Sequence, residues 1–128
     1  MIVLDTHAWI WWVTESRKLS TKARRAIGRA DVLGVHLISC WEVAMLVAKG
    51  RLSLSLDVGE WVAQALRRPK IDLLPFLPDQ AVLATRLPGD FHDDPADRFI
   101  VAACLGGGYP LVTKDRKIHA WGHVKTIW

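Results

Sequence analysis

Four acidic residues are the side chains of this sequence best suited to chemistry, although they lie far apart in the chain: Asp5, Glu42, Asp97 and Asp115. Asp5 and Asp115 follow apolar, strand-like runs, whereas Glu42 and Asp97 fall in the first turns of helix-like runs. In a parallel sheet with helical crossovers, the carboxyl ends of the strands and the amino ends of the next helices meet at one edge, where open α/β folds bind ligands. The pattern therefore predicts that the four carboxylates gather at that edge.

Carboxylates gathered in this way repel one another unless a cation lies among them. At an effective dielectric near 20, two carboxylates ~4 Å apart repel by about 4 kcal/mol, which is a large part of a domain's stability of ~5–15 kcal/mol. A divalent cation removes this cost, and all-oxygen ligands favour Mg²⁺, or Mn²⁺ as a substitute, over zinc. Such a cation suits the hydrolysis of phosphodiesters, because it orients the phosphate and activates water for in-line displacement.

Each acid also has an ordinary structural explanation. Asp5 fits a turn after a strand, and Glu42 lies three residues after Ser39, in the spacing of a capping box. The segment Asp94–Asp97 reads as a helix start, with Asp94 as N-cap, proline at the first helical position and Asp97 in the first turn. Asp115 lies between two basic residues, where a surface ion pair is expected. The metal site is favoured only when the four acids are taken together.

Composition narrows the class of protein. The chain has 128 residues, 51% of them hydrophobic, which suits one domain over residues 1–128. The longest uncharged stretches are far shorter than the ~20 residues of a membrane span, and no signal peptide is apparent. The two cysteines form no disulfide framework, so we expect a reducing cytoplasm. There is no Walker loop and no G-x-G-x-x-G, which argues against a nucleoside triphosphate or dinucleotide enzyme.

The charge balance favours a polyanionic substrate. The chain has 17 basic and 13 acidic residues and a net charge of +4, and only nine acidic residues remain when the four focal acids are set aside. An acidic site on a basic body fits a nucleic acid held through a metal. Arg98, Lys114 and Arg116 adjoin focal acids and are candidates for contacts with substrate phosphates. The basic helix Ser20–Ala30 is interpreted instead as a solvated helix face.

The elements that must position these residues alternate between strand and helix. Strand-like runs are Ile2–Leu4, Val32–Ile38, Ile71–Leu74, Pro110–Thr113 and Val124–Trp128, and helices are expected to begin at Ser20, Ser39, Asp57, Asp79 and Asp94. This alternation predicts right-handed crossovers and an α/β fold, in which helices cover both faces of a mostly parallel sheet. Most of the seven tryptophans are expected in the core, and the Leu52–Trp61 region is one candidate wall of an apolar groove for a partner helix.

Four segments resemble those of PIN domains, and more narrowly those of the VapC toxins of bacterial toxin–antitoxin pairs. They are Ile2–Trp9, Ser39–Ala44, His92–Arg98 and Leu111–Asp115, in the family's order along the chain. The resemblance implies a three-layer α/β/α fold and a Mg²⁺-dependent endoribonuclease that acts as the toxin of a type II pair in a bacterium or archaeon. It also implies a homodimer and neutralisation by a small VapB-like antitoxin, which lays its C-terminal segment over the toxin.

The resemblance also assigns roles to individual residues. By position, the family's acidic quartet falls on Asp5, Glu42, Asp97 and Asp115, and Asp94 matches an accessory acid. The hydroxyl positions beside the acids match Thr6 and Thr113. Our hypothesis is that Asp5, Asp97 and one or both of Glu42 and Asp115 hold Mg²⁺, directly or through waters. An activated water attacks the RNA phosphate, and one carboxylate, for which Glu42 is the candidate, accepts a proton. Because a water nucleophile does not need the 2′-hydroxyl, the products should carry 5′-phosphate and 3′-hydroxyl ends.

Two other classes of function stay open at this point. A receiver-like phosphoacceptor domain also carries acids at the carboxyl edge of a sheet, but it usually needs adjacent acids after the first strand, and Asp5 is followed by Thr6. Formation of a stable aspartyl-phosphate would favour it. A non-catalytic module that binds RNA or protein on the same fold would bind without turnover. A phosphatase with Asp-x-Asp is disfavoured, because residue 7 is histidine.

Overall fold

A five-stranded parallel sheet forms the centre of the computed structural model, which describes residues 1–128. The strand order is β3-β2-β1-β4-β5, and every neighbouring pair is parallel. The strands are β1 (Ile2–Leu4), β2 (Leu33–His36), β3 (Ile71–Leu74), β4 (Leu111–Val112) and β5 (Thr126–Ile127). All five strands that the sequence predicts are present. Strands β1 and β3 have the expected bounds, and β2, β4 and β5 are each shorter than expected by two or three residues.

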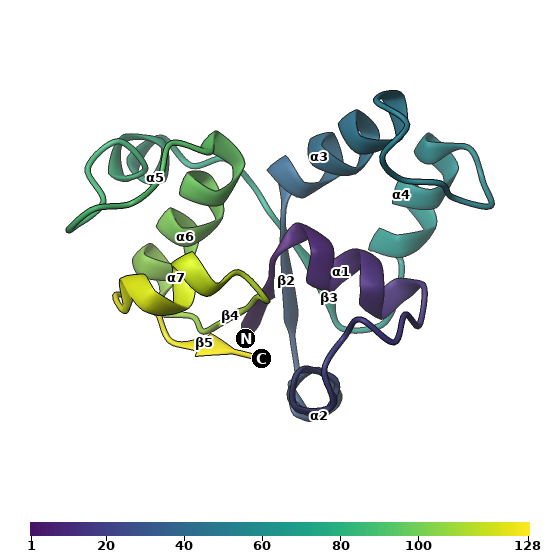
Figure 1. Ribbon diagram of the computed structural model, residues 1–128, viewed down its shortest axis with the longest axis horizontal. Helices are drawn as coiled ribbons and strands as arrows, with labels where there is room; N and C mark the ends of the chain where they lie inside the picture. The colour runs from purple at the N-terminus through teal and green to yellow at the C-terminus, as the bar shows by residue number, and fades with distance from the viewer.

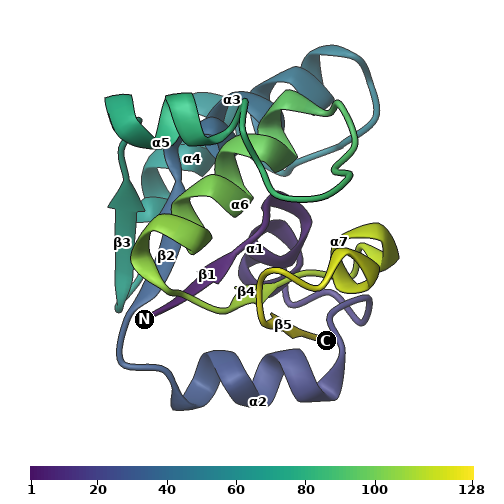
Figure 2. The same cartoon turned by 90° about the vertical axis from the view of Figure 1, so that its left-hand side faces the viewer.

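Seven helices cover the sheet and produce the expected three layers (Figures 1 and 2). The helices are α1 (Thr6–Val13), α2 (Thr21–Arg29), α3 (Leu37–Ala48), α4 (Val58–Leu66), α5 (Pro78–Leu83), α6 (Pro95–Gly107) and α7 (Arg116–Trp121). Helices α1, α2 and α4 pack on one face of the sheet, and α5, α6 and α7 lie on the other. Helix α3 contacts α1, α4 and α6. No helix is long and apolar enough to cross a membrane.

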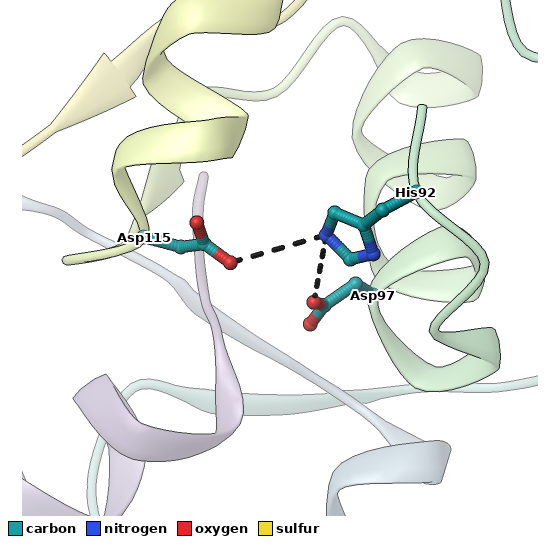
Figure 3. Close-up of side chains that lie close together, drawn as sticks. All are labelled: His92, Asp97 and Asp115. Atoms are coloured by element: carbon teal, nitrogen blue, oxygen red, sulfur yellow. Dashed lines mark ion pairs between the residues drawn. The ribbon is translucent and has the colours of Figure 1, made fainter. Parts of the chain in front are cut away.

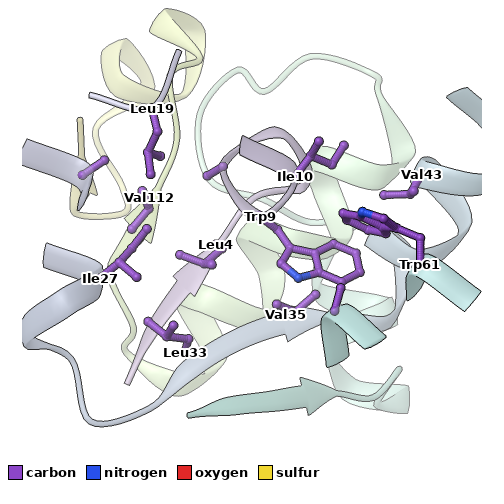
Figure 4. Packing of buried hydrophobic residues seen from close by; sticks show 13 residues of the cluster. Leu4, Trp9, Ile10, Leu19, Ile27, Leu33, Val35, Val43, Trp61 and Val112 are labelled. Carbon is purple, nitrogen blue, oxygen red and sulfur yellow. The ribbon is translucent and has the colours of Figure 1, made fainter. Parts of the chain in front are cut away.

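Strand β1 is the middle strand, and its side chains supply both halves of the core. Leu4 packs with Trp9, Val35 and other residues under α1, α2 and α4, as Figure 4 shows. Val3 points to the opposite face and packs with residues of α6 and α7. Both side chains are fully buried, as alternation along a central parallel strand requires. The burial of β1 fixes the place of the residue that follows it, Asp5.

Helix starts follow the capping signals in most places. The Ser20 hydroxyl accepts a hydrogen bond from the amide of Ala23, and the Asp57 carboxylate accepts one from Gly59. The Asp94 carboxylate accepts one from the amide of Asp97 at 3.1 Å. Each bond satisfies an amide that has no partner within its helix. The sequence predicts these three starts correctly.

The start of α3 differs from the prediction, and the difference concerns Glu42. The helix begins at Leu37 directly after β2, and its N-cap is His36, whose Nδ1 accepts from the amide of Ile38 at 3.0 Å. Ser39 lies inside the first turn, and its hydroxyl is 2.9 Å from that of Thr6. The capping-box interpretation of Ser39 and Glu42 is therefore wrong, and Glu42 lies in the second turn of α3.

Two further helices differ from the sequence prediction. The helix expected to begin at Asp79 begins one residue earlier, at Pro78, and ends at Leu83. The carbonyl of Ala84 has no helical donor available, because residue 88 is a proline without an N–H, and it accepts from the guanidinium of Arg98 instead. Helix α7 was not predicted; it begins after Asp115 and ends at Gly122, whose φ is +75°. Six residues are too few for an apolar period to be visible in the sequence.

Tryptophans are less buried than expected. Only Trp9 and Trp61 are buried, with ring centroids 5.1 Å apart. The side chain of Trp41 is 58% exposed, and the other four tryptophans are half-buried. Two tryptophans thus lie fully in the core, and the four half-buried ones pack against it. Amphipathic rings tolerate a half-buried position better than aliphatic side chains do.

Candidate active site

All four focal acids line one cavity at the carboxyl edge of the sheet. The cavity has a volume of about 470 Å³ and is lined by Asp5, Thr6, His7, Trp11, Glu42, Asp94, Asp97, Lys114 and Asp115. Five of these nine residues are acids, and one is a lysine. The acids come from four separate segments of the chain, and the order of the strands brings these segments together because β1 lies between β2 and β4.

Asp5 is held at the junction of β1 and α1. Its Oδ1 accepts a hydrogen bond from the amide of Ala8 at 2.8 Å, so it is the N-cap of α1. One oxygen of the Asp5 carboxylate, Oδ1, therefore has the ordinary structural role that the sequence suggested. Burial raises the pKa of Asp5 above its ordinary value, against the lowering effect of hydrogen bonds from Thr113 and Ala8. The nearby Asp115 raises the pKa of Asp5 further.

Glu42 is oriented by a chain of hydroxyl groups. The Thr6 hydroxyl donates to Oε1 of Glu42. Because this bond uses the only hydroxyl proton of Thr6, the Ser39 hydroxyl donates in turn to Thr6, across 2.9 Å. Thr6 and Ser39 are almost completely buried. Burial raises the pKa of Glu42, the bond from Thr6 lowers it, and Asp94 and Asp5 raise it.

The carboxyl group of Asp97, like those of Asp5 and Glu42, has a raised pKa. Burial, followed by the charges of Asp94, Glu42, Asp5 and Asp115, raises the pKa of Asp97 to about 8. A carboxyl group with this pKa is largely protonated near neutral pH when no cation is present. The helix-start explanation of the Asp94–Asp97 segment is correct for Asp94, but it leaves the carboxylate of Asp97 free to face the cavity.

Asp115 lies at the junction of β4 and α7. Its Oδ1 accepts from the amide of Lys117 at 2.8 Å, and its own amide donates to the hydroxyl of Thr113 at 3.1 Å. Thr113 is completely buried. Asp115 forms no ion pair with Lys114 or Arg116, because the ion pairs in the structure are those that His92 makes with Asp97 and Asp115. The surface ion pair expected for Asp115 is therefore wrong.

The contacts of His92 with the acids could not be predicted from the sequence. Its Nε2 lies 3.2 Å from Oδ2 of Asp97 and 3.9 Å from Oδ2 of Asp115 (Figure 3). The ligand atoms of these three residues all lie within 4.8 Å of one another. Nδ1 accepts from the amide of Asp94 at 3.3 Å, so a neutral ring carries its proton on Nε2, toward the two carboxylates. Nothing in the spacing of the histidines indicated this contact.

The donor set fits a divalent cation. Repulsion and burial raise the pKa values of Asp5, Glu42 and Asp97, so the metal-free site holds more negative charge than its surroundings stabilise. Such unbalanced negative charge is expected where a cation completes a site. Oxygen donors dominate the cavity, as Mg²⁺ and Mn²⁺ require.

The three basic residues that adjoin the acids differ in their contacts. Lys114 lines the cavity, and its Nζ lies 5.7 Å from the centre of the Trp11 ring. Arg116 is exposed and does not line the cavity. The guanidinium of Arg98 donates to the carbonyls of Ala84, Phe91 and His92. Arg98 is therefore no longer a candidate for a phosphate contact. Its guanidinium N–H groups are bonded to backbone carbonyls of the segment that carries His92.

Trp11 is the one hydrophobic residue that lines the acidic cavity. Two lysines, Lys18 and Lys114, lie within 6 Å of its ring centre, at 5.9 and 5.7 Å. His7 and Trp128 pack against the same ring. Trp9 of the same helix is buried in the core, so α1 presents Trp11, and not Trp9, to the acids.

Comparisons with known proteins agree with this geometry. Residues 2–123 match the PIN domain family. The chain is 37% identical to Ribonuclease VapC22 of Mycobacterium tuberculosis over 129 residues, which cover 99% of this chain and 98% of that protein.

Two solved structures share the fold. One is Mycobacterium tuberculosis VapC20, a toxin that cleaves the sarcin-ricin loop, with a TM-score of 0.70, 16% identity and 98% coverage of both chains. The other is VapBC2 of Rickettsia felis bound to a DNA fragment from its promoter, with a TM-score of 0.70, 14% identity and coverage of 98% of this chain and 97% of that one.

Proposed function

Since the chain belongs to the PIN-domain family, and within it to the VapC ribonucleases, we propose that it is a toxin that hydrolyses RNA phosphodiesters at the acidic cavity. The observation that carries the proposal is the convergence of Asp5, Glu42, Asp97 and Asp115 on one cavity. Burial, followed by the charges of the neighbouring carboxylates, raises the pKa of Asp97 to about 8. Perturbed carboxylates in a cleft are typical of functional sites.

We propose Asp5, Asp97 and Asp115 as ligands of a divalent cation, with Glu42 close by. The cation is Mg²⁺, and Mn²⁺ substitutes for it. When bound, it supplies Lewis acidity, which activates water and offsets the charge that builds up on the phosphate. Asp94 contributes negative charge at the rim and fixes the start of α6. His92 holds Oδ2 of Asp97 and Oδ2 of Asp115 on the same side of the cavity.

The protein's own residues prepare the proton transfer. Thr6 occupies Oε1 of Glu42, which leaves Oε2 as the oxygen that accepts a proton from the attacking water. The raised pKa of Glu42 brings its basicity closer to neutral pH, as general-base catalysis requires. Thr113 holds the amide of Asp115 and stabilises its carboxylate position. Lys114 at the rim is placed to contact a phosphate next to the scissile one.

End-group analysis of cleaved RNA tests this function. We expect cleavage that needs Mg²⁺, is lost with EDTA, and leaves 5′-phosphate and 3′-hydroxyl ends. Asp5→Asn should lower kcat/KM by at least about a hundredfold, since it removes charge from the cation site, while the fold is kept. Cyclic 2′,3′-phosphate ends, or full activity of Asp5→Asn, would refute the mechanism. Binding of RNA without turnover would favour the non-catalytic module, and a stable aspartyl-phosphate would favour the receiver-like domain.

The proposed protein partner is a VapB-like antitoxin, made with the toxin in the cytoplasm. A groove of about 420 Å³ lies between α1 and α4, and its wall includes Leu56 and Trp61, in the region that the sequence nominated. Leu56 is one of the exposed large hydrophobic residues. An apolar helix of the antitoxin fits such a groove. Titration of the toxin with its antitoxin tests the assignment, when the change in tryptophan fluorescence of the wild type is compared with that of Trp61→Phe. An equal change in the two proteins would contradict it.

We also propose a homodimer. Large hydrophobic side chains are exposed at the start of α3, on the edge strand β3, in the link from β3 to α5 and on α5: Leu37, Trp41, Leu73, Phe76, Leu77 and Val82. Exposed apolar side chains next to a sheet edge are typical of an interface. Light scattering of the purified protein should give twice the mass of the chain, and Trp41→Glu should shift it toward the single-chain mass of 14.4 kDa.

A further inference from the structure

A second groove, at a different place from the acidic cavity, lies between α2 and β5; we call it the α2–β5 groove. Its volume is about 690 Å³, larger than the 470 Å³ of the acidic cavity. It is lined by Thr21, Lys22, Arg25, Ala26, Arg29, Lys125, Thr126 and Ile127. Figure 2 shows α2 and β5 close together, at the same end of the molecule as the N-terminus. None of the residues that line the acidic cavity lines this groove.

The α2–β5 groove is strongly positive. Four of its eight lining residues are lysine or arginine, and none is acidic. All four basic side chains are exposed. No lysine or arginine of the structure forms an ion pair with a carboxylate, since both ion pairs belong to His92. The groove therefore carries four positive charges that no protein carboxylate within contact distance offsets.

The arrangement on α2 is costly for the protein alone. Lys22, Arg25 and Arg29 are spaced i, i+3 and i+7, so they share one helix face. Arg25 and Arg29 are four residues apart, a spacing at which like charges destabilise a helix by a few tenths of a kcal/mol. Lys22 lies in the first turn, where the helix dipole disfavours a positive charge. A bound polyanion would offset all of these effects.

Two observations distinguish the groove from an ordinary solvated helix face. Lys125 comes from the other end of the chain and completes the positive wall opposite α2. Arg24, the fourth basic residue of the helix, is turned away, because its guanidinium donates to the carbonyl of Ser16 at 3.2 Å. The remaining cations thus line a concave surface, together with the hydroxyl-bearing residues Thr21 and Thr126. Cations and hydroxyl groups in a groove suit phosphate oxygens.

We propose that the α2–β5 groove binds the phosphodiester backbone of the RNA substrate at a segment away from the scissile bond. This inference rests on the proposed ribonuclease function. The sequence interpretation of the Ser20–Ala30 helix as a merely solvated face is revised accordingly. The groove holds a part of the RNA that the acidic cavity does not contact, so it contributes affinity for long substrates and none for short ones.

The double variant Lys22→Glu/Arg25→Glu tests the proposal against a matched control. The control is Lys49→Glu/Arg51→Glu, which makes the same change in net charge at exposed residues near the end of α3 that line none of the grooves described. We expect kcat/KM on a long structured RNA to fall at least about tenfold in the test variant, with cleavage of a tetranucleotide unchanged. The control should leave the cleavage of both RNAs close to that of the wild type.

Salt dependence gives a second readout that does not need turnover. Binding of a long RNA is measured in the Asp5→Asn background, and log Kd is plotted against the logarithm of the salt concentration. The slope of this plot should be smaller by about 1.4 in the test variant, because each lost contact with a single-strand phosphate lowers it by about 0.7. Lys22→Arg/Arg25→Lys should keep the full slope. Thermal unfolding checks that the variants fold.

Three outcomes would overturn the proposal. One is equal behaviour of the test and control variants on long RNA. Another is an equal loss on tetranucleotide and long RNA, which would place the groove in the active site. The third is unchanged RNA binding together with loss of antitoxin or operator DNA binding, which would assign the groove to those partners. Failure of the wild-type protein to cleave any RNA would instead refute the ribonuclease function, whatever the binding data show.

Discussion

At the scale of the residue, Glu42 shows how one tertiary contact changes the meaning of a local signal. Ser39 and Glu42 have the spacing of a capping box, yet both side chains are engaged by Thr6 from another element. The N-cap role passes to His36, whose ring nitrogen accepts from the amide of Ile38. Glu42 is thereby free to act in the cavity, and Thr6 and Ser39 become the residues that orient it.

Removal of the Thr6 hydroxyl should impair both activity and stability. In Thr6→Val the Ser39 hydroxyl loses its partner in a buried site, which costs about 1–3 kcal/mol of unfolding free energy. Glu42 loses its orienting bond, so kcat should fall more than KM changes. Urea unfolding and RNA cleavage kinetics measure the two effects.

Thr6→Ser is the matched variant, because it keeps the hydroxyl and should retain most of the activity. Thr85→Val serves as a surface control, since the Thr85 hydroxyl bonds only to a carbonyl of its own turn. A Thr6→Val protein with wild-type kcat would contradict the role given to this hydroxyl.

Because the pKa of Asp97 is raised, we expect the free energy of unfolding of the metal-free protein to depend on pH. Its pKa is raised from 3.8 to about 8 in the folded state, so the folded state binds the proton more tightly than the unfolded state does. The stabilising contribution is full below about pH 4 and is lost as the pH rises through 8. With EDTA present, Asp97→Asn should therefore unfold at a higher temperature than the wild type at pH 9, and the difference should shrink toward pH 5.

The comparison with Asp97→Asn isolates this effect from that of His36, whose pKa burial lowers to about 4. His36 acts in the opposite direction, because its contribution is lost as the pH falls from about 6.5 through 4. Added Mg²⁺ should stabilise the wild type and not the variant. Identical unfolding temperatures of the two proteins from pH 5 to 9 would rule out the perturbation of Asp97.

At the scale of the element, the loop between α5 and α6 positions one wall of the site. Arg98 of α6 donates to the carbonyls of Ala84, Phe91 and His92. Trp121 of α7 donates from Nε1 to the carbonyl of Pro88 at 2.7 Å and packs against Phe91. Two helices thus hold a loop that has no regular hydrogen-bond ladder of its own, and the loop presents His92 to the carboxylates.

Replacement of Arg98 should loosen this loop. Arg98→Ala leaves three carbonyls without their donor, so we expect a loss of about 2–4 kcal/mol of unfolding free energy and faster hydrogen exchange in residues 84–92. Arg98→Lys should rescue little, because an ammonium group cannot reproduce the planar fork of donors. If Arg98 contacted the substrate instead, both variants would weaken RNA binding while hydrogen exchange in the loop stayed unchanged.

At the scale of the whole molecule, the sheet separates positive and negative charge. Five acids line the cavity at the carboxyl edge, whereas four cations line the α2–β5 groove. The net charge of +4 hides this separation. Because the acidic cavity repels a polyanion unless a cation is bound there, we expect substrate binding and metal binding to be coupled.

Metal binding should therefore stabilise the entire fold. A ligand that binds only the folded state at a hundred times its Kd adds about 2.7 kcal/mol, and Mg²⁺ should relieve the carboxylate repulsion as well. We expect the unfolding temperature to rise with Mg²⁺ and Mn²⁺ in the wild type and in Lys49→Glu/Arg51→Glu. Asp5→Asn and Asp115→Asn should respond weakly, and an equal response of all four proteins would argue against a cation held by these acids.

Much of the molecule follows from the sequence by itself. The strand and helix alternation, the Asp94 cap and the apolar run before Asp5 are local patterns, and local patterns are sufficient because parallel-sheet geometry puts strand ends on one edge. The positions of Asp5, Glu42, Asp97 and Asp115 at the cavity could be predicted for that reason. The resemblance of four short segments to the VapC toxins was also visible, since these segments surround the same acids.

Only the tertiary structure decided which neighbours those residues have. Glu42 accepts a hydrogen bond from Thr6 and caps no helix. The guanidinium of Arg98 is bonded to a loop and not available to a phosphate. His92 lies within ionic range of Asp97 and Asp115. Lys125 completes a groove with α2, although about a hundred residues of chain lie between them. The physical reason is the same in each case. Polar side chains are satisfied by whichever partner packing brings within hydrogen-bond or ionic range, and sequence spacing does not specify that partner.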